Sequence, residues 1–199
     1  MKNLSRLLIT CLFLFNISPA SSQQTERHPE MIKAILSTSF GMPQEAYKIY
    51  LKLSKEGMTR AQIRLARALY DGEGVEKDLG KAKLWYERAA KLGNKNGQYI
   101  LGDLYYNGLS TKRDYNQALI WFYRAAYNDN KMAPMKLGIM HSRGLATKKD
   151  RETAQMWFEI YKIKGGKDAD VFLGANGIHL TDSQRSTAIE KAKKWSVAR

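Results

Sequence analysis

The chain has 199 residues and is strongly basic, since 33 lysines and arginines against 19 acidic residues give a formal net charge of +14 and a pI near 9.8. Cys11 is its only cysteine, so no disulfide can form within the chain. These numbers exclude a disulfide-stapled scaffold, and the length is sufficient for one sizeable domain held together by its packed core.

Residues 1–22 have the three parts of a secretory signal peptide. A basic start is followed by an apolar run over residues 7–15 and by small residues at 18–20. The apolar run is too short for a comfortable membrane span. We therefore expect cleavage after residue 20 or 22, loss of Cys11, export to the periplasm and no integral membrane segment after cleavage.

A period of 36 residues runs through the middle of the chain. Four kinds of residue repeat at this interval: Trp85, Trp121 and Trp157; Gly72, Gly108 and Gly144; Asp78, Asp114 and Asp150; Ala82, Ala118 and Ala154. Several independent positions that share one period indicate an array of structural repeats. The predicted repeats are 61–96, 97–132 and 133–168.

Each repeat is predicted to contain two helices around a glycine turn. Leu65 and Leu69 belong to an apolar stripe at helical spacing, and Gly72 suits the left-handed backbone that ends a helix. Asp78 suits the N-cap of the second helix, in which small alanines permit close packing around Trp85. One hairpin cannot bury both of its apolar faces, so stacked hairpins are expected. The predicted fold is an all-α, right-handed solenoid.

The same register extends beyond the three repeats in both directions. An entry hairpin is predicted at 29–57, with helices near 30–38 and 43–56. A C-terminal capping hairpin is predicted at 169–196, where Thr181 and Gln184 have the spacing of a capping box. Residues 23–199 are therefore expected to form a single repeat domain.

The repeat pattern resembles the Sel-one-like repeat, a longer relative of the tetratricopeptide repeat. The residues that carry the resemblance are Leu101, Gly102, Tyr105, Gly108, Asp114, Ala118, Trp121, Phe122, Ala125 and Ala126. The pattern varies between repeats: His141 stands at a tyrosine position, Ser110 and Ala146 replace a glycine, and Tyr161 replaces an alanine. The last change suggests that the third repeat packs against something other than a standard fourth repeat.

Motifs for catalysis, cofactors and metals are missing from the sequence. It has no nucleophile elbow, phosphate-binding loop or dinucleotide fingerprint. The three histidines, His28, His141 and His179, have no ligand spacing, and His141 is expected to pack in place of the tyrosine. We therefore predict a protein that is not an enzyme and has no cofactor and no metal site.

The basic charge bears on the choice of partner. In a cytosolic protein this pI would suggest nucleic acid, but an exported protein has other partners available, so no nucleic acid is expected. The prediction is another protein with an acidic surface, bound on the concave face formed by the first helices; a solvated basic surface without specific meaning stays an alternative. The candidate contact residues are Arg60, Arg64, Arg67, Tyr70, Asp103, Tyr106, Lys136, Ile139 and Arg143.

The resemblance implies a role in protein binding, as an adaptor, scaffold or inhibitor in the periplasm. It also covers small exported immunity proteins that neutralise a toxic effector, such as a phospholipase delivered by a type VI secretion system. Binding to peptidoglycan or envelope polysaccharide is a third possibility. General protein binding ranks first among these functions.

Overall fold

The computed structural model describes residues 28–197, so the predicted signal peptide and Cys11 lie outside the described residues. In this part of the chain there are ten helices and no strand. The helices are α2 (Pro29–Ser39), α3 (Pro43–Lys55), α4 (Thr59–Asp71), α5 (Leu79–Lys91), α6 (Lys95–Asn107), α7 (Tyr115–Tyr127), α8 (Ala133–Arg143), α9 (Arg151–Ile163), α10 (Ala169–Ala175) and α11 (Asp182–Val197). The predicted all-α solenoid is confirmed.

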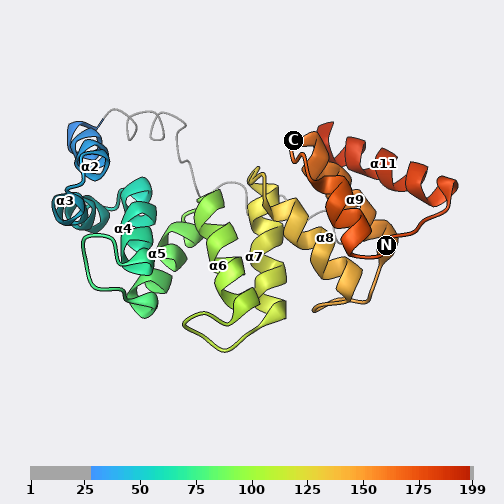
Figure 1. Cartoon of the computed structure of the whole chain (residues 1–199), viewed down its shortest axis with the longest axis horizontal. Coiled ribbons are helices and arrows are strands. Elements are labelled where there is room, and N and C mark those ends of the chain that lie inside the picture. The colour runs from blue at the N-terminus through green and yellow to red at the C-terminus, as the bar shows by residue number, and fades with distance from the viewer. Residues whose placement is uncertain (1–27, 198–199) are drawn as a thin grey trace, which may run out of the picture.

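The helices stand in pairs along an elongated body, from α2 at one end to α11 at the other (Figure 1). Helices α4 and α5, α6 and α7, and α8 and α9 form the three repeat hairpins, and each hairpin packs on the next. The first two repeats begin at Thr59 and Lys95, two residues before the predicted starts at 61 and 97. No helix within residues 28–197 combines the length and the apolar character needed to cross a bilayer.

The ends of the repeat helices follow the predicted chemistry. The side chains of Asp78, Asp114 and Asp150 accept a backbone N–H from the residue three positions later, at 2.8, 3.0 and 2.9 Å. Gly72 closes α4 with a left-handed φ of 80°, and the equivalent glycines do the same for α6 and α8. Each repeat therefore fixes its own helix boundaries by local hydrogen bonds and backbone conformation.

The core is built from aromatic rings packed on small residues. The ring of Phe122 lies against Gly102, where an added Cβ would come within 2.8 Å of it, and Phe158 lies against Gly138 in the same way. Trp121 packs between repeats, against Ala90 of the first repeat and Leu101 of the second. The small positions of the repeat thus allow the two helices of a hairpin to approach closely, and the large rings fill the remaining space.

The second turn position of the repeat has a left-handed backbone whether or not it is a glycine. Gly74 has a φ of 74°, and Ser110 and Ala146 at the equivalent positions both have a φ of 58°. Gly74 also lies against other backbone, because a Cβ there would meet the carbonyl oxygen of Pro43 at 2.2 Å. The first repeat needs glycine at this position so that its turn can pack on the entry hairpin.

We expect Gly74→Ala to lower the free energy of unfolding by about 1–3 kcal/mol, because the new methyl group forces the turn away from Pro43. Ser110→Gly is the matched variant, since Ser110 has a left-handed backbone at the equivalent position and is exposed; we expect it to change stability by less than about 1 kcal/mol. Urea titration of both variants measures the difference. Equal stability of the two would contradict the close packing at Gly74.

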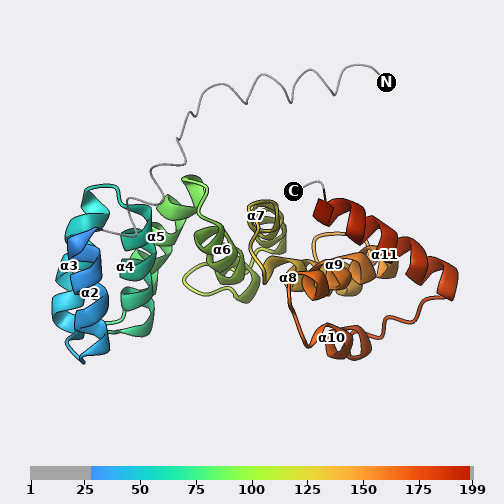
Figure 2. The ribbon, with the colours of Figure 1, turned by 90° about the horizontal axis from the view of Figure 1, so that it is seen from above.

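The C-terminal unit differs from a repeat. Helix α10 has only seven residues, and both α10 and α11 pack on α9, from different sides (Figure 2). Tyr161, in place of an alanine, donates a hydrogen bond from its hydroxyl to Asp168 at 2.7 Å and contacts Phe172 of α10. Thr181 and Gln184 form the reciprocal hydrogen bonds of a capping box at the start of α11.

Candidate groove between the first helices of the repeats

A hollow along the repeat array lies between α4 and α6 and reaches the start of α8. Its volume is about 630 Å³. The residues that line this groove are Arg60, Ile63, Arg64, Arg67, Tyr86, Asn94, Asn96, Tyr99, Ile100, Asn130 and Met132. The first helices of the first two repeats thus form its two long walls.

The two walls carry different residues at equivalent repeat positions. Arg60 on α4 corresponds to Asn96 on α6 and to Met132 before α8, each 36 residues apart. Arg64 on α4 likewise corresponds to Ile100 on α6. The groove therefore has a cationic wall on α4 and a wall of apolar and amide side chains on α6 and at the start of α8.

The charge of the groove is positive. None of the described residues that line it is acidic. Arg67 donates from Nε to Asp71 at 3.3 Å, but both side chains are largely exposed, so this i,i+4 pair neutralises the wall only weakly. Arg64 has no hydrogen bond or ion pair with the residues that the structure describes, and it also lines a smaller hollow of about 250 Å³ between α3 and α4.

Two tyrosines add neutral hydroxyl groups to the groove. Burial raises the pKa of Tyr99 to about 12 and raises the pKa of Tyr86 further. Both phenols therefore stay protonated at any physiological pH, and Tyr99, which is half-buried, can donate a hydrogen bond to a ligand.

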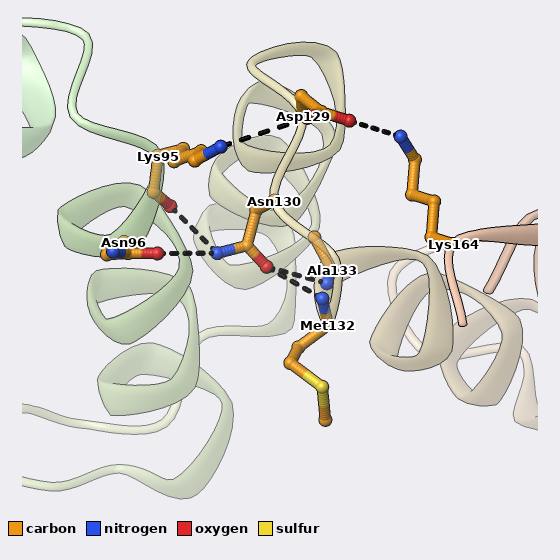
Figure 3. Close-up of polar contacts among 7 residues, drawn as sticks. All are labelled: Lys95, Asn96, Asp129, Asn130, Met132, Ala133 and Lys164. Atoms are coloured by element: carbon orange, nitrogen blue, oxygen red, sulfur yellow. Dashed lines mark hydrogen bonds and ion pairs between the residues drawn. The ribbon is translucent and has the colours of Figure 1, made fainter. Parts of the chain in front are cut away.

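Asn130 holds the junction between the second and third repeats at the edge of the groove (Figure 3). Its Oδ1 accepts the backbone N–H groups of Met132 and Ala133 at 2.9 and 3.0 Å, which caps the start of α8. Its Nδ2 donates to the carbonyl oxygen of Lys95 at 3.3 Å and to Oδ1 of Asn96 at 3.1 Å. One side chain, only 5% exposed, thereby joins the start of α8 to the start of α6.

Asp129, next to Asn130, forms a second connection between repeats, through ion pairs. Its carboxylate pairs with Lys164 and lies 3.8 Å from Nζ of Lys95, so it links three successive turns (Figure 3). The bond to Lys164 lowers the pKa of Asp129. Asp129 has a left-handed φ of 62° at a position where the other repeats have Gly93 and Gly165. The ion pairs give a reason for an aspartate at a position that favours glycine.

Three of the nine predicted contact residues line this groove. Arg60, Arg64 and Arg67 line the groove, while the other six are not among its lining residues. Tyr70 packs against the N-terminal core, with Nζ of Lys77 5.7 Å from the centre of its ring.

The remaining five predicted residues make contacts within the array. Asp103 and Lys136 form an ion pair between α6 and α8 at 2.5 Å, and Nζ of Lys136 lies 5.1 Å from the ring of Tyr106. Ile139 packs in the C-terminal core, and Arg143 donates from Nε to Asn176 at 3.2 Å. These contacts join α8 to α6 and to the C-terminal unit, and the charges of Asp103 and Lys136 neutralise each other.

Sequence reasoning missed most of the second wall. Asn96, Tyr99, Ile100 and Met132 line the groove but were not predicted. The signal was present, because three of these positions correspond to Arg60 or Arg64 in the 36-residue register. Projecting Arg60 and Arg64 forward by one repeat gives Asn96 and Ile100, and projecting Arg60 forward by two repeats gives Met132.

His141 is buried, with 7% of its surface exposed, as expected for a residue in the place of a packing tyrosine. Its Nε2 lies 2.7 Å from the hydroxyl of Tyr123, and burial lowers its pKa. Within residues 28–197, no group of three or more histidine, cysteine or acidic side chains is placed to hold a metal ion.

We expect acid to destabilise the protein through His141. Below about pH 6.5 the imidazole of His141 is protonated in the unfolded chain, whereas burial keeps it neutral in the folded chain to a lower pH. The stability present above pH 6.5 therefore decreases as the pH falls. His141→Leu, which copies Leu69 of the first repeat, removes this titration. The melting temperature should fall more steeply between pH 7 and pH 5.5 in the parent protein than in the variant. Parallel curves would show that His141 does not contribute.

The fold and the groove define the class of protein: an all-α helical-repeat protein with a groove along its first helices. The family model of the Sel1 repeat matches residues 59–94, 96–130 and 133–160, which begin at or within one residue of the starts of α4, α6 and α8. The chain belongs to the Sel1-repeat family. Proteins with Sel1 repeats generally mediate protein–protein interactions as scaffolds, and the family is typically non-catalytic.

Two solved structures show how far the likeness extends. A Sel1 repeat protein from Oxalobacter formigenes has a TM-score of 0.69 and 24% identity, over 89% of this chain and 76% of that one. The protein c5321, a protective antigen present in uropathogenic Escherichia coli strains and displaying an SLR fold, has a TM-score of 0.69 and 25% identity. That match covers 83% of this chain but only 38% of c5321. No curated protein matches the chain.

Proposed function

We propose that this protein binds another protein in the groove between α4 and α6, through an acidic region of the partner. The observation that carries the proposal is the cationic wall: three arginines within two turns of α4, with no acidic residue among the described groove lining. Arginine combines a planar set of donors with a long apolar stem, and it is enriched at the energetically important positions of protein interfaces.

Charge is expected to act mainly on the rate of association. The arginine side chains stand at an open surface, so they attract an acidic partner over about 8–10 Å at physiological salt. The absence of a cofactor motif and the typical behaviour of the family both favour binding over catalysis. Within this proposal the protein is an adaptor, a scaffold or an inhibitor.

Charge reversal of the cationic wall tests the proposal. We expect Arg64→Glu combined with Arg67→Glu to weaken binding to the partner recovered by pull-down at least tenfold, because attraction becomes repulsion. The melting temperature should change little, since Arg67 is largely exposed and Arg64 has no partner in the described chain. Lys191→Glu on the exposed side of α11 is the matched control and should bind normally. Unaltered affinity of the double variant would place the binding site elsewhere.

We also propose that the protein acts in the periplasm after cleavage of residues 1–20 or 1–22. The support is the basic start, apolar run and small residues of this segment. Mass spectrometry of the mature protein should show a start at Ser21 or Gln23, and a mature form that retains Cys11 would contradict the proposal. A toxic effector among the proteins recovered by pull-down would identify the inhibitor as an immunity protein, and a recovered envelope polysaccharide would favour the third possibility.

A further inference from the structure

We propose that the groove takes an amphipathic segment of the partner, with acidic side chains along α4 and an apolar side chain between Ile100 and Met132. This inference rests on the proposed function and adds the chemistry of the bound segment to it. It follows from three features of the groove: the cationic wall on α4, the apolar side chains of the opposite wall, and the hydrogen bonds that the amide groups of that wall already make.

The cationic wall sets the acidic half of the segment. Arg60, Arg64 and Arg67 follow one another at i, i+4 and i+7, so they lie along one side of α4, with neighbouring Cβ atoms about 5–6 Å apart. Two carboxylates separated by one helical turn, or by two residues of an extended chain, match this spacing. A single anion would use only part of the wall.

The apolar wall sets the other half. Met132 is 40% exposed and Ile100 is half-buried, so together they present apolar surface on the side of the groove opposite the arginines of α4. A purely acidic ligand would leave this surface in contact with water. A purely apolar ligand would cover Arg64 without giving its guanidinium group a partner, which is unfavourable. A segment with both characters satisfies both walls.

The asparagine side chains of the groove favour a ligand that carries hydrogen-bond acceptors. Oδ1 of Asn94 accepts the N–H groups of Asn96 and Gly97, and Oδ1 of Asn130 accepts those of Met132 and Ala133. Oδ1 of Asn96 accepts from Nδ2 of Asn130. The acceptor oxygens of all three asparagines are therefore engaged, whereas Arg64 and the hydroxyl of Tyr99 offer donors. This arrangement selects carboxylates and gives a basic segment few partners.

The shape of the groove favours a protein segment over a membrane surface. A hollow of about 630 Å³ between two helices can enclose several side chains, but the flat surface of a bilayer cannot enter it. The recognition resembles other cases in which a segment lies in a groove and anchors apolar side chains at a regular spacing.

Two labelled peptides test the inference by fluorescence anisotropy. The first has four glutamates followed by Leu-Phe-Leu, and the second has the same glutamates followed by Ser-Gly-Ser. We expect the first to bind at least tenfold more tightly than the second. Met132→Ser should remove most of this difference, whereas Ile120→Ser, which changes a similarly exposed residue on α7, should leave it intact. Vesicles containing phosphatidylglycerol should not bind.

The outcomes separate the two proposals. Equal binding of both peptides, or binding of the vesicles alone, would overturn the amphipathic segment even if the Arg64→Glu, Arg67→Glu variant loses the recovered partner. Normal binding of the recovered partner by that double variant would overturn the proposed function itself. An effect of Met132→Ser on the melting temperature would be checked against Ile120→Ser before the affinities are compared.

Discussion

Trp121→Ala is expected to lower the free energy of unfolding by about 3–5 kcal/mol. The indole is 8% exposed and packs between Ala90 and Leu101, so truncation leaves a cavity at the junction of the first two repeats. Truncating a large aromatic side chain in such a position typically costs this much stability, because the free energy of the cavity adds to that of the lost apolar burial. Urea denaturation of the purified variant measures the effect.

Trp85→Ala is the matched control for this prediction. Trp85 has the same place in the first repeat, and an arginine lies over its ring at 4.5 Å, compared with 4.6 Å for Trp121. Trp85 is only half-buried, so its truncation should cost clearly less than that of Trp121. Because both tryptophans lose a similar cation–π contact, the difference between the two variants reports the burial of Trp121 between repeats. Equal losses would contradict the packing described for Trp121.

Asn130→Ala is expected to lower the free energy of unfolding by about 2–4 kcal/mol. The substitution removes the cap of α8, which alone costs about 0.5–2 kcal/mol, and it leaves the buried N–H of Ala133 without a partner. It also removes the connection to Lys95 and Asn96 on α6. Differential scanning calorimetry gives the loss.

Asn94→Ala provides the comparison within the same molecule. Asn94 caps α6 with the same geometry, and no hydrogen bond from its Nδ2 to another repeat is described, so its loss should be about 1 kcal/mol. Asp129→Asn should cost less than about 1 kcal/mol, since the carboxylate and its ion pairs stand at the surface. If Asn130→Ala costs no more than Asn94→Ala, the connection between repeats contributes nothing.

Much of the fold could be predicted because the repeat encodes it locally. The 36-residue period, the aspartate caps and the glycine turns each act within one hairpin, so they can be identified without knowing how hairpins pack. The capping box of Thr181 and Gln184 is equally local, and the structure contains it. Residue types with a strong local preference therefore predicted the helices and their ends.

The groove was harder to predict because it depends on the rotation between hairpins. The rotation decides which side chains meet, and the 36-residue period does not reveal it. Asp103 and Lys136 are 33 residues apart and were expected to be free for a partner, but the rotation brings them into an ion pair. The same rotation places Arg60 and Arg64 opposite Asn96 and Ile100 instead of beside further cations. The packed structure is needed to distinguish the residues that make contacts between hairpins from those that line the groove.

The cross-repeat hydrogen bonds of Asn130 reach back by 34 and 35 residues, and that of Lys164 by 35, so each joins a hairpin only to the one before it. Stability in such an array is a sum over hairpins and the junctions between neighbours. A weakened junction should therefore uncouple the parts on its two sides without unfolding either. In Asn130→Ala, hydrogen exchange should become faster first in α8 and α9, while α4 and α5 keep their protection. The two long walls of the groove, α4 and α6, stand on the protected side of that boundary, whereas Met132 lies at the boundary itself. The molecule can therefore lose its C-terminal order, and the Met132 contact with it, while it keeps the arginines of α4.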